Sequence, residues 1–151
     1  MKKDTRKGKV GYTTGVFDMF HIGHLHILKN AKAQCDYLIV GVSSDELVQQ
    51  YKNKTSIIPY ANRKEIIESI KYVDEVVVQS DRDKTKACKE LGFDVMFVGD
   101  DWKNSELFNK LEIELKECGA EIVYFPYTKE VSSTNFRNVL QELYDKENFG
   151  A

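Results

Sequence analysis

The 151-residue sequence predicts a single α/β domain built on a doubly wound, parallel, five-stranded sheet. Strand-like and helix-like patterns alternate along the chain, which favours parallel strands joined by right-handed helical crossovers. Residues 37–42 are almost continuously apolar, as in a strand that helices cover on both faces. The length fits one domain with a sizeable core. Such sheets bind ligands at the carboxyl ends of their strands, where the strand order reverses.

Each element is marked by its own residues. The strands are expected at residues 10–16, 37–42, 75–79, 94–98 and 121–125. The helices are expected at 23–34, at a short segment from about 45, and at 60–72, 83–91, 106–118 and 132–144, with 106–118 the longest. Glycines at 92 and 119 end two helices. Residues 49–59 are expected to form an exposed loop, and 1–9 and 146–151 to be tails of a domain spanning 10–145.

Composition excludes several classes of protein. The net charge of −2 gives no basic field for nucleic acid, so no nucleic-acid partner is expected. No apolar run approaches the roughly 20 residues of a membrane span, and the charged first nine residues do not resemble a secretory signal. Cys35, Cys88 and Cys118 are odd in number and far apart, so we expect reduced thiols and a cytoplasmic protein.

Residues 15–25 hold two histidines at a strand–turn–helix junction. Such a junction directs backbone N–H groups and the positive helix end at whatever lies above the strand. His21 and His24, with Gly23 between them, place two imidazoles beside this anion-attracting end. The segment lacks the Gly-Lys-Ser/Thr of a P-loop and the ligand spacing of a zinc site, and we name no metal ligand anywhere in the chain.

Residues 16–24 resemble the H-x-G-H signature of the small nucleotidyltransferases, and within them the cytidylyltransferases, closest to the glycerol-3-phosphate type. The resemblance extends over about 10–143 and implies a Rossmann-like nucleotidyltransferase fold. It also implies transfer of CMP from CTP to a phosphorylated alcohol, with release of pyrophosphate, Mg²⁺ on the CTP phosphates, and a homodimer. The product would be a CDP-alcohol, such as CDP-glycerol, for cell-wall or capsule polymers or phospholipid.

This chemistry needs no general base, because the attacking phosphate is already ionised near pH 7. Catalysis then depends on positioning and on neutralising charge. The resemblance makes His21 and His24 the catalytic donors to phosphate oxygens, and imidazolium would add charge. The alternative is that both side chains only cap and pack. The nucleotide is expected to meet the first strand and its turn at Thr14, Gly15, Val16, Phe17 and Gly23.

Several further residues are assigned through the resemblance. Lys52 and Lys54, in the predicted loop, would approach substrate phosphates, or they are solvated lysines. Arg63 matches an arginine of the family and is assigned to the nucleotide, since its fork suits a phosphate or a carboxylate. Asp18 is assigned to the acceptor, with ordering of the loop through N–H groups or a metal contact as alternatives.

The run Lys71 to Val76 resembles an R-Y-V-D-E-V motif with lysine in place of arginine, which removes the bidentate fork. Lys71 and Asp74 are assigned to the acceptor, although Asp74 could simply begin the strand and pair with Lys71. The ethanolamine-phosphate enzymes resemble this variant.

Two later motifs complete the expected nucleotide site. Gly99, Asp100, Asp101 and Trp102 resemble a G-D-D-W motif, with a core tryptophan and capping aspartates as the alternative. Val131, Ser132, Ser133 and Thr134 resemble the last family signature, in which hydroxyls and free N–H groups at a helix start cradle pyrophosphate. Upstream, Tyr127 replaces the family's arginine and is assigned to the acceptor.

We therefore expect an enzyme acting on CTP and a small phosphoalcohol, most specifically glycerol 3-phosphate. The alternatives are ethanolamine phosphate or choline phosphate as acceptor, an ATP-using adenylyltransferase, and a nucleotide-binding module without turnover.

Overall fold

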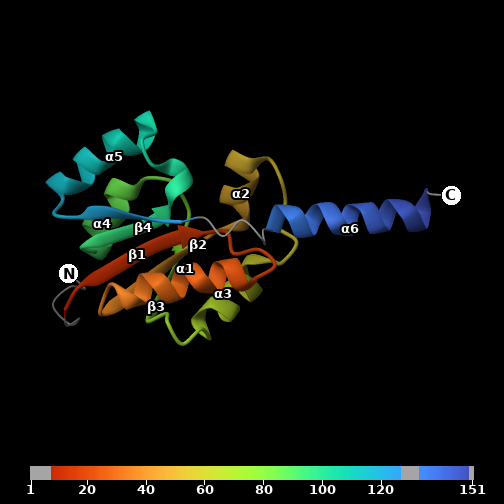
Figure 1. Ribbon diagram of the computed structural model, residues 1–151, viewed down its shortest axis with the longest axis horizontal. Helices are drawn as coiled ribbons and strands as arrows, with labels where there is room; N and C mark the ends of the chain where they lie inside the picture. The colour runs from red at the N-terminus through yellow and green to blue at the C-terminus, as the bar shows by residue number, and fades with distance from the viewer. Residues whose placement is uncertain (1–7, 127–132, 150–151) are drawn as a thin grey trace.

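The computed structural model describes residues 8–126 and 133–149, which form one parallel five-stranded sheet with helices on both faces (Figure 1). The strand order is β3-β2-β1-β4-β5. The strands are β1 (Val10–Gly15), β2 (Tyr37–Ser43), β3 (Glu75–Gln79), β4 (Val95–Gly99) and β5 (Glu121–Phe125). The order therefore runs outward from β1 in both directions, so the predicted doubly wound topology is confirmed. The reversal lies between β1 and β4, which are neighbours in the sheet.

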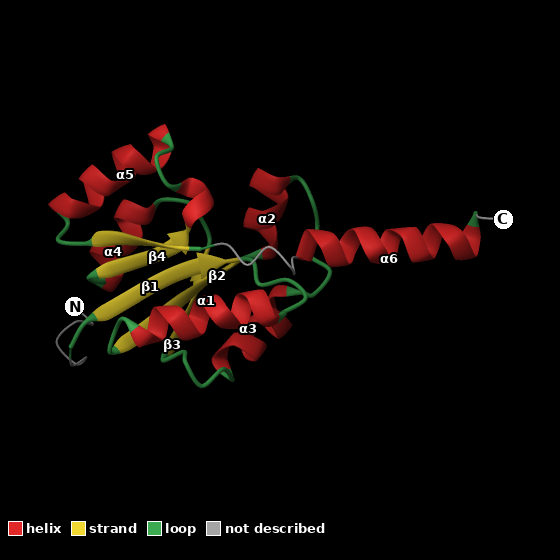
Figure 2. Ribbon diagram, in the orientation of Figure 1, coloured by secondary structure: helices red, strands yellow, loops and turns green. Residues whose placement is uncertain are grey.

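The helices lie as two layers against the sheet, with α1 and α3 on one face and α4 and α5 on the other (Figure 2). The helices of the described chain are α1 (Ile22–Ala33), α2 (Asp45–Lys52), α3 (Tyr60–Glu68), α4 (Lys84–Leu91), α5 (Glu106–Glu117) and α6 (Ser133–Asn148), with a 3-10 turn at Asp100–Trp102. No helix in the described part of the chain combines the length and the apolar character that crossing a bilayer requires.

The sheet separates two apolar cores, and β2 shows why. Leu38, Val40 and Val42 point to the α1 and α3 side, while Ile39 between them points to the α4 and α5 side. All four side chains are fully buried. A strand covered on both faces is apolar at consecutive positions, which is the pattern that residues 37–42 display in the sequence.

Three element boundaries differ from the prediction. α2 continues to Lys52, so the first four residues of the predicted loop 49–59 are helical and the loop starts at residue 53. Asn53 ends this helix in a left-handed conformation, with φ of 50°. Glycine usually occupies such a position, but the sequence carries no glycine here that would indicate the end of the helix. α3 ends at Glu68 rather than near residue 72. The longest helix is α6, with 16 residues, and not α5, with 12.

α6 extends away from the body of the molecule, and only its beginning lies against the sheet domain (Figure 1). The Phe136 ring contacts the ring of His21 at a centroid distance of 5.5 Å. Beyond it, large apolar side chains at helical spacing are exposed, namely Val139, Leu140, Leu143 and Tyr144. The helix thus exposes an apolar stripe that starts beside residues 16–24, the turn with His21 and His24 that we call the histidine turn.

Candidate active site

A cavity of about 780 Å³ opens at the carboxyl ends of the central strands, at the predicted position. Residues 13–18 and 97–99 form its floor, the start of α1 forms one wall, and the starts of α4 and α5 form the opposite wall. The predicted site residues that line it are Thr14, Gly15, Val16, Phe17, Asp18, His21, Gly23, His24, Lys52, Lys54, Gly99 and Trp102. The turn after β1 and the loop after β4 therefore converge as expected.

The histidine turn is held in a fixed shape by its own backbone. Phe17 and Met19 have φ values of 54° and 49°. Left-handed backbone is uncommon for residues other than glycine and carries a cost of about 1 kcal/mol or more at each position. The surrounding contacts must therefore determine this conformation, which directs the chain from β1 into α1.

The two histidines cap the helix that they begin, and this fixes which ring nitrogen carries the proton. The backbone N–H of Gly23 donates to Nδ1 of His21 at 3.1 Å, and the N–H of His21 donates to Nδ1 of His24 at 3.2 Å. A ring nitrogen that accepts a hydrogen bond carries no proton, so in each neutral ring the proton is on Nε2. The rings stack at 3.8 Å. The capping alternative is therefore correct for Nδ1, while Nε2–H remains a donor in the pocket wall.

Burial keeps both rings neutral at physiological pH. It lowers the pKa of His24 to about 4, with a smaller contribution from His21, and it also lowers the pKa of His21. At pH 7 the pair therefore offers hydrogen-bond donors and no imidazolium charge, so any positive charge has to come from other side chains.

Asp18 joins the histidine turn to distant segments. Its carboxylate accepts the backbone N–H groups of Ile57 and Ile58, both at 2.8 Å, and Nη2 of Arg137 in α6. Burial alone would raise the pKa of Asp18, but these hydrogen bonds outweigh it and hold the pKa below its usual value. The side chain is 4% exposed. The structure thus gives Asp18 a role in ordering the histidine turn, through segments that are distant in the sequence rather than through a local turn.

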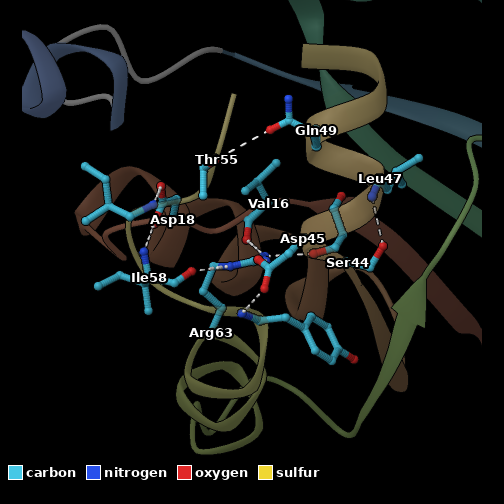
Figure 3. A network of polar contacts seen from close by, with 12 residues as sticks. Val16, Asp18, Ser44, Asp45, Leu47, Gln49, Thr55, Ile58 and Arg63 are labelled. Carbon is cyan, nitrogen blue, oxygen red and sulfur yellow. Dashed lines mark hydrogen bonds and ion pairs between the residues drawn. The ribbon is translucent and has the colours of Figure 1, made fainter. Parts of the chain in front are cut away.

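Arg63 is a correction to the sequence prediction. It does not line the cavity, and its side chain is 1% exposed in the centre of a closed polar network (Figure 3). Its guanidinium donates to the carbonyl oxygens of Ile58, Val16 and Ser43 and to Asp45 Oδ1, at distances from 2.7 to 2.8 Å. The fork binds carbonyls and a carboxylate of this protein, which joins α3 to the ends of β1 and β2.

Lys71 and Asp74 lie at the opposite edge of the sheet, which corrects their assignment to the acceptor. Both precede β3, and residues that precede parallel strands lie at the amino edge. The Asp74 carboxylate accepts Nζ of Lys32 at 2.6 Å and the backbone N–H of Leu38 at 2.8 Å. Asp74 therefore begins the strand and pairs with a lysine of α1, and not with Lys71.

The G-D-D-W segment divides into two parts. Gly99 and Trp102 line the cavity, whereas Asp100 and Asp101 are exposed and do not. The Trp102 ring is 41% exposed and stacks on Phe108 at 5.1 Å, so it is a cavity wall and not core. With Leu107 and Leu111 these rings give the β4 side of the cavity an apolar end.

Many of the other lining residues are charged. In the described part of the chain, six cations and three carboxylates line the cavity: Lys52, Lys54, Arg82, Lys84, Lys110 and Arg137 against Asp18, Asp83 and Glu114. The carboxylates are engaged, because Asp18 binds Arg137, Asp83 caps α4 and Glu114 accepts the hydroxyl of Thr85. A chain of net charge −2 thus concentrates positive charge in this cavity.

Four of these cations were not expected from the sequence, and one of them, Lys110, lies in the middle of α5. Arg82 and Lys84 lie at the start of α4, in a stretch that reads as a solvated helix terminus. Arg137 lies in α6, three residues beyond Thr134 of the last predicted signature, but the signature itself does not include it. Lys52 and Lys54, which were expected, have pKa values lowered first by partial removal from water and then by neighbouring cations.

The last signature is described only in part. Ser133 and Thr134 begin α6, and Tyr127, Val131 and Ser132 lie outside the described residues. The next turn of α6 touches the histidine turn through Phe136 and Arg137. The start of the last helix is therefore beside the histidines, as the topology predicts.

Comparison with known proteins agrees with this geometry. A family model described as cytidylyltransferase-like matches residues 12–139. Glycerol-3-phosphate cytidylyltransferase of Bacillus subtilis (strain 168) is 36% identical over 132 residues, which cover 87% of this chain and 96% of that protein. FAD synthase of Thermococcus kodakarensis is 35% identical over 136 residues, covering 87% and 89% of the two chains.

Among solved structures, the lipopolysaccharide core biosynthesis protein of Thermoplasma volcanium GSS1 has a TM-score of 0.71 and 29% identity, and the match covers 82% of this chain and all of that one. The family match spans the sheet, both helical layers and the histidine turn. The chain belongs to the cytidylyltransferase-like family and is a nucleotidyltransferase with a Rossmann-like fold.

Proposed function

We propose that this protein transfers CMP from CTP to a small phosphorylated alcohol, most specifically glycerol 3-phosphate, giving CDP-glycerol and pyrophosphate. The observation that carries the proposal is the cavity itself, which combines neutral histidine donors, apolar side chains and cations in one lining. The apolar side chains suit a nucleobase, and the cations suit an anionic acceptor. The identity to glycerol-3-phosphate cytidylyltransferases supports the choice of substrates.

The chemistry follows from these groups. A phosphate oxygen of the acceptor attacks the α-phosphorus of CTP, and the bond to the bridging oxygen breaks in line, so pyrophosphate leaves with that electron pair. Nε2–H of His21 and His24 donates to oxygens that gain charge in the transition state. Lys52 and Lys54 supply the positive charge that neutral imidazoles lack. The free N–H groups at the start of α6, with Ser132, Ser133 and Thr134, hold the leaving pyrophosphate.

Mg²⁺ enters this scheme with the substrate. Among the described residues, no group of three or more histidine, cysteine or acidic side chains is placed to hold a metal ion. We therefore assign the ion to the CTP phosphates, which Mg²⁺ normally bridges while keeping several waters.

A second candidate comes from the FAD synthases, which are about as similar in sequence. That reaction uses ATP and an acceptor with a broad flat flavin ring. Among the described lining residues, the aromatic ring beside Lys52 and Arg82 is that of Tyr51, and the guanidinium of Arg82 lies over it at 4.7 Å. These cations favour a small anionic polyol phosphate over a flavin, and they repel the ammonium groups of ethanolamine phosphate and choline phosphate.

Pyrophosphate release distinguishes these candidates. CTP and ATP are each supplied with glycerol 3-phosphate, ethanolamine phosphate, choline phosphate and FMN in turn. We expect release from CTP with glycerol 3-phosphate. Release from ATP with FMN alone supports the FAD synthase reaction, and CTP binding without release under every acceptor supports a binding module.

We also propose a homodimer in which α6 covers its apolar stripe against the second subunit, close to the first strand–helix unit. Sedimentation equilibrium is expected to give a dimer at micromolar concentration, and Leu143→Glu, in the middle of the stripe, is expected to give a monomer. A monomeric unsubstituted protein would contradict this arrangement.

A further inference from the structure

Lys84 is the first residue of α4, and its side chain reaches across to the central strand. Its Nζ donates to Oγ1 of Thr14 at 3.1 Å. The residue is partly buried and lines the cavity, and no carboxylate of the described chain lies within ion-pair distance of its ammonium group. Among the described residues, the partner that holds this cation in the site is the hydroxyl group of Thr14.

The location is electrostatically unfavourable for a positive charge. A helix N-terminus carries a partial positive charge, and cations are disfavoured there. The pKa of Lys84 is lowered to about 8, first by burial of the ammonium group and then by Arg82, against a smaller opposing effect of Asp81. Asp81 is itself bound to Lys86 at 3.2 Å.

Further cations gather on the same side. The guanidinium of Arg82 lies 4.7 Å from the ring centre of Tyr51, and Nζ of Lys52 lies 5.5 Å from the same ring. Arg82 lowers the pKa values of both Lys52 and Lys84, and Lys52 in turn lowers the pKa of Lys54. From α5 the cavity receives Lys110 and Glu114, whose carboxylate accepts the hydroxyl of Thr85. A converging set of cations with little internal compensation favours the binding of an anion.

We propose that Lys84, assisted by Arg82, binds the phosphate of the acceptor at the side of Thr14 that faces α4. The inference rests on the proposed function and refines it, because it separates the acceptor's phosphate from the nucleotide's. The histidine pair contacts the transferred phosphoryl group from the α1 wall, and Lys84 holds the attacking phosphate from the α4 wall. Thr14, at the end of β1, lies between the two walls and positions the Lys84 ammonium group before substrate arrives.

The test compares Lys84→Met and Lys84→Arg with a matched control, Lys86→Met, which removes an exposed lysine two residues further along α4. Initial rates are measured against glycerol 3-phosphate at saturating CTP, and the Kd of CTP is measured by calorimetry. A charge-assisted hydrogen bond corresponds to a change of about 10- to 100-fold. We therefore expect that rise in acceptor KM for Lys84→Met, with the Kd of CTP unchanged, partial recovery in Lys84→Arg, and normal values in Lys86→Met.

Two further measurements keep the outcome clear. Because the empty site disfavours the charge, Lys84→Met should melt no lower than the unsubstituted protein, whereas a structural role for Lys84 predicts a lower Tm. Lys84→Gln provides a second neutral variant if methionine folds poorly. Weaker CTP binding with an unchanged acceptor KM would assign Lys84 to the nucleotide and overturn the proposal.

Direct binding separates this inference from the proposed function. Glycerol 3-phosphate and inorganic phosphate are each titrated into the protein without CTP and followed by calorimetry. If no acceptor supports turnover but Lys84→Met still loses phosphate binding about 10-fold or more, the subsite stands and the cytidylyltransferase proposal fails. If Lys84→Met binds both anions like the unsubstituted protein, the subsite is wrong whatever the turnover.

Discussion

Arg63 and Lys84 are two cations near the same edge of the sheet, and their surroundings differ completely. Arg63 directs its donors to three backbone carbonyls and to Asp45, all within the protein. In the described part of the chain, the ammonium group of Lys84 donates to the hydroxyl of Thr14, and the neighbouring charge with the larger effect on it is the cation Arg82. The first arrangement is complete without a ligand, whereas the second is not.

The difference separates polar groups that maintain the fold from polar groups that meet a substrate. The family resemblance assigned Arg63 to the nucleotide, and nothing in the sequence marked Lys84. Internal hydrogen-bond partners therefore decide the role better than residue type does, because a buried donor needs an acceptor from one source or the other. Four substitutions or conditions test this distinction.

The largest effect is expected at Arg63. Arg63→Met leaves buried carbonyl oxygens without donors, so the free energy of unfolding should fall by about 3 kcal/mol or more. Urea denaturation followed by circular dichroism measures it. Loss of CTP affinity at full stability would instead return Arg63 to the nucleotide site.

The histidines should show the reverse pattern. His24→Ala and His21→Ala remove a donor to the transferred phosphoryl group, so kcat should fall about 100-fold or more. Stability should change by only about 1 kcal/mol, the usual contribution of a helix cap. Single-turnover rates at saturating CTP measure the first effect, and near-normal turnover in both variants would contradict the assignment.

Asp18 lies between the two classes, since it lines the cavity but is bound within the protein. Asp18→Asn places an amide NH₂ where the carboxylate accepts N–H groups, and stability should fall by about 1–3 kcal/mol. A double-mutant cycle with Arg137→Met measures the part that depends on the ion pair. Independent, additive effects would show that Arg137 does not anchor α6 through Asp18.

The smallest effect is a pH dependence of stability. Because the folded protein keeps the pKa of His24 near 4, the unfolded chain binds more protons between that pH and about 6.5, the usual histidine pKa. Stability from this group is complete above pH 6.5 and is lost as the pH falls towards 4, by about 1 kcal/mol between pH 7 and pH 5.5. His24→Gln should lack this component in urea titrations at the two pH values. An equal pH dependence in the variant would show that His24 is not the group responsible.

The sequence predicts the architecture well because its strongest signals are local. Apolar runs such as 37–42 mark covered strands, and the histidine turn marks the strand after which the order reverses. Helix ends were less predictable where a residue other than glycine takes the left-handed conformation, as Asn53 does. Lys52 therefore proved to be in a helix and not in a loop.

Site residues were predictable when their role depends on sequence neighbours and not when it depends on a crossover. His21 and His24 are three residues apart, so their cooperation is visible in the chain. Lys84 meets Thr14 across 70 residues, after two strands and the helices between them. The Lys71 and Asp74 motif was misassigned for a related reason, since residues that precede β3 lie at the amino edge of a parallel sheet.

The left-handed residues Phe17 and Met19 have a consequence for turnover. The energetic cost of these left-handed conformations is met during folding, when Asp18 binds Ile57, Ile58 and Arg137 and so fixes the histidine turn. The imidazole donors are consequently aimed before any nucleotide arrives, and substrate binding has no loop to reshape at that wall. The substrate should therefore bind to this wall as to a rigid surface. Conformational change on binding should be confined to the side chains of the facing wall.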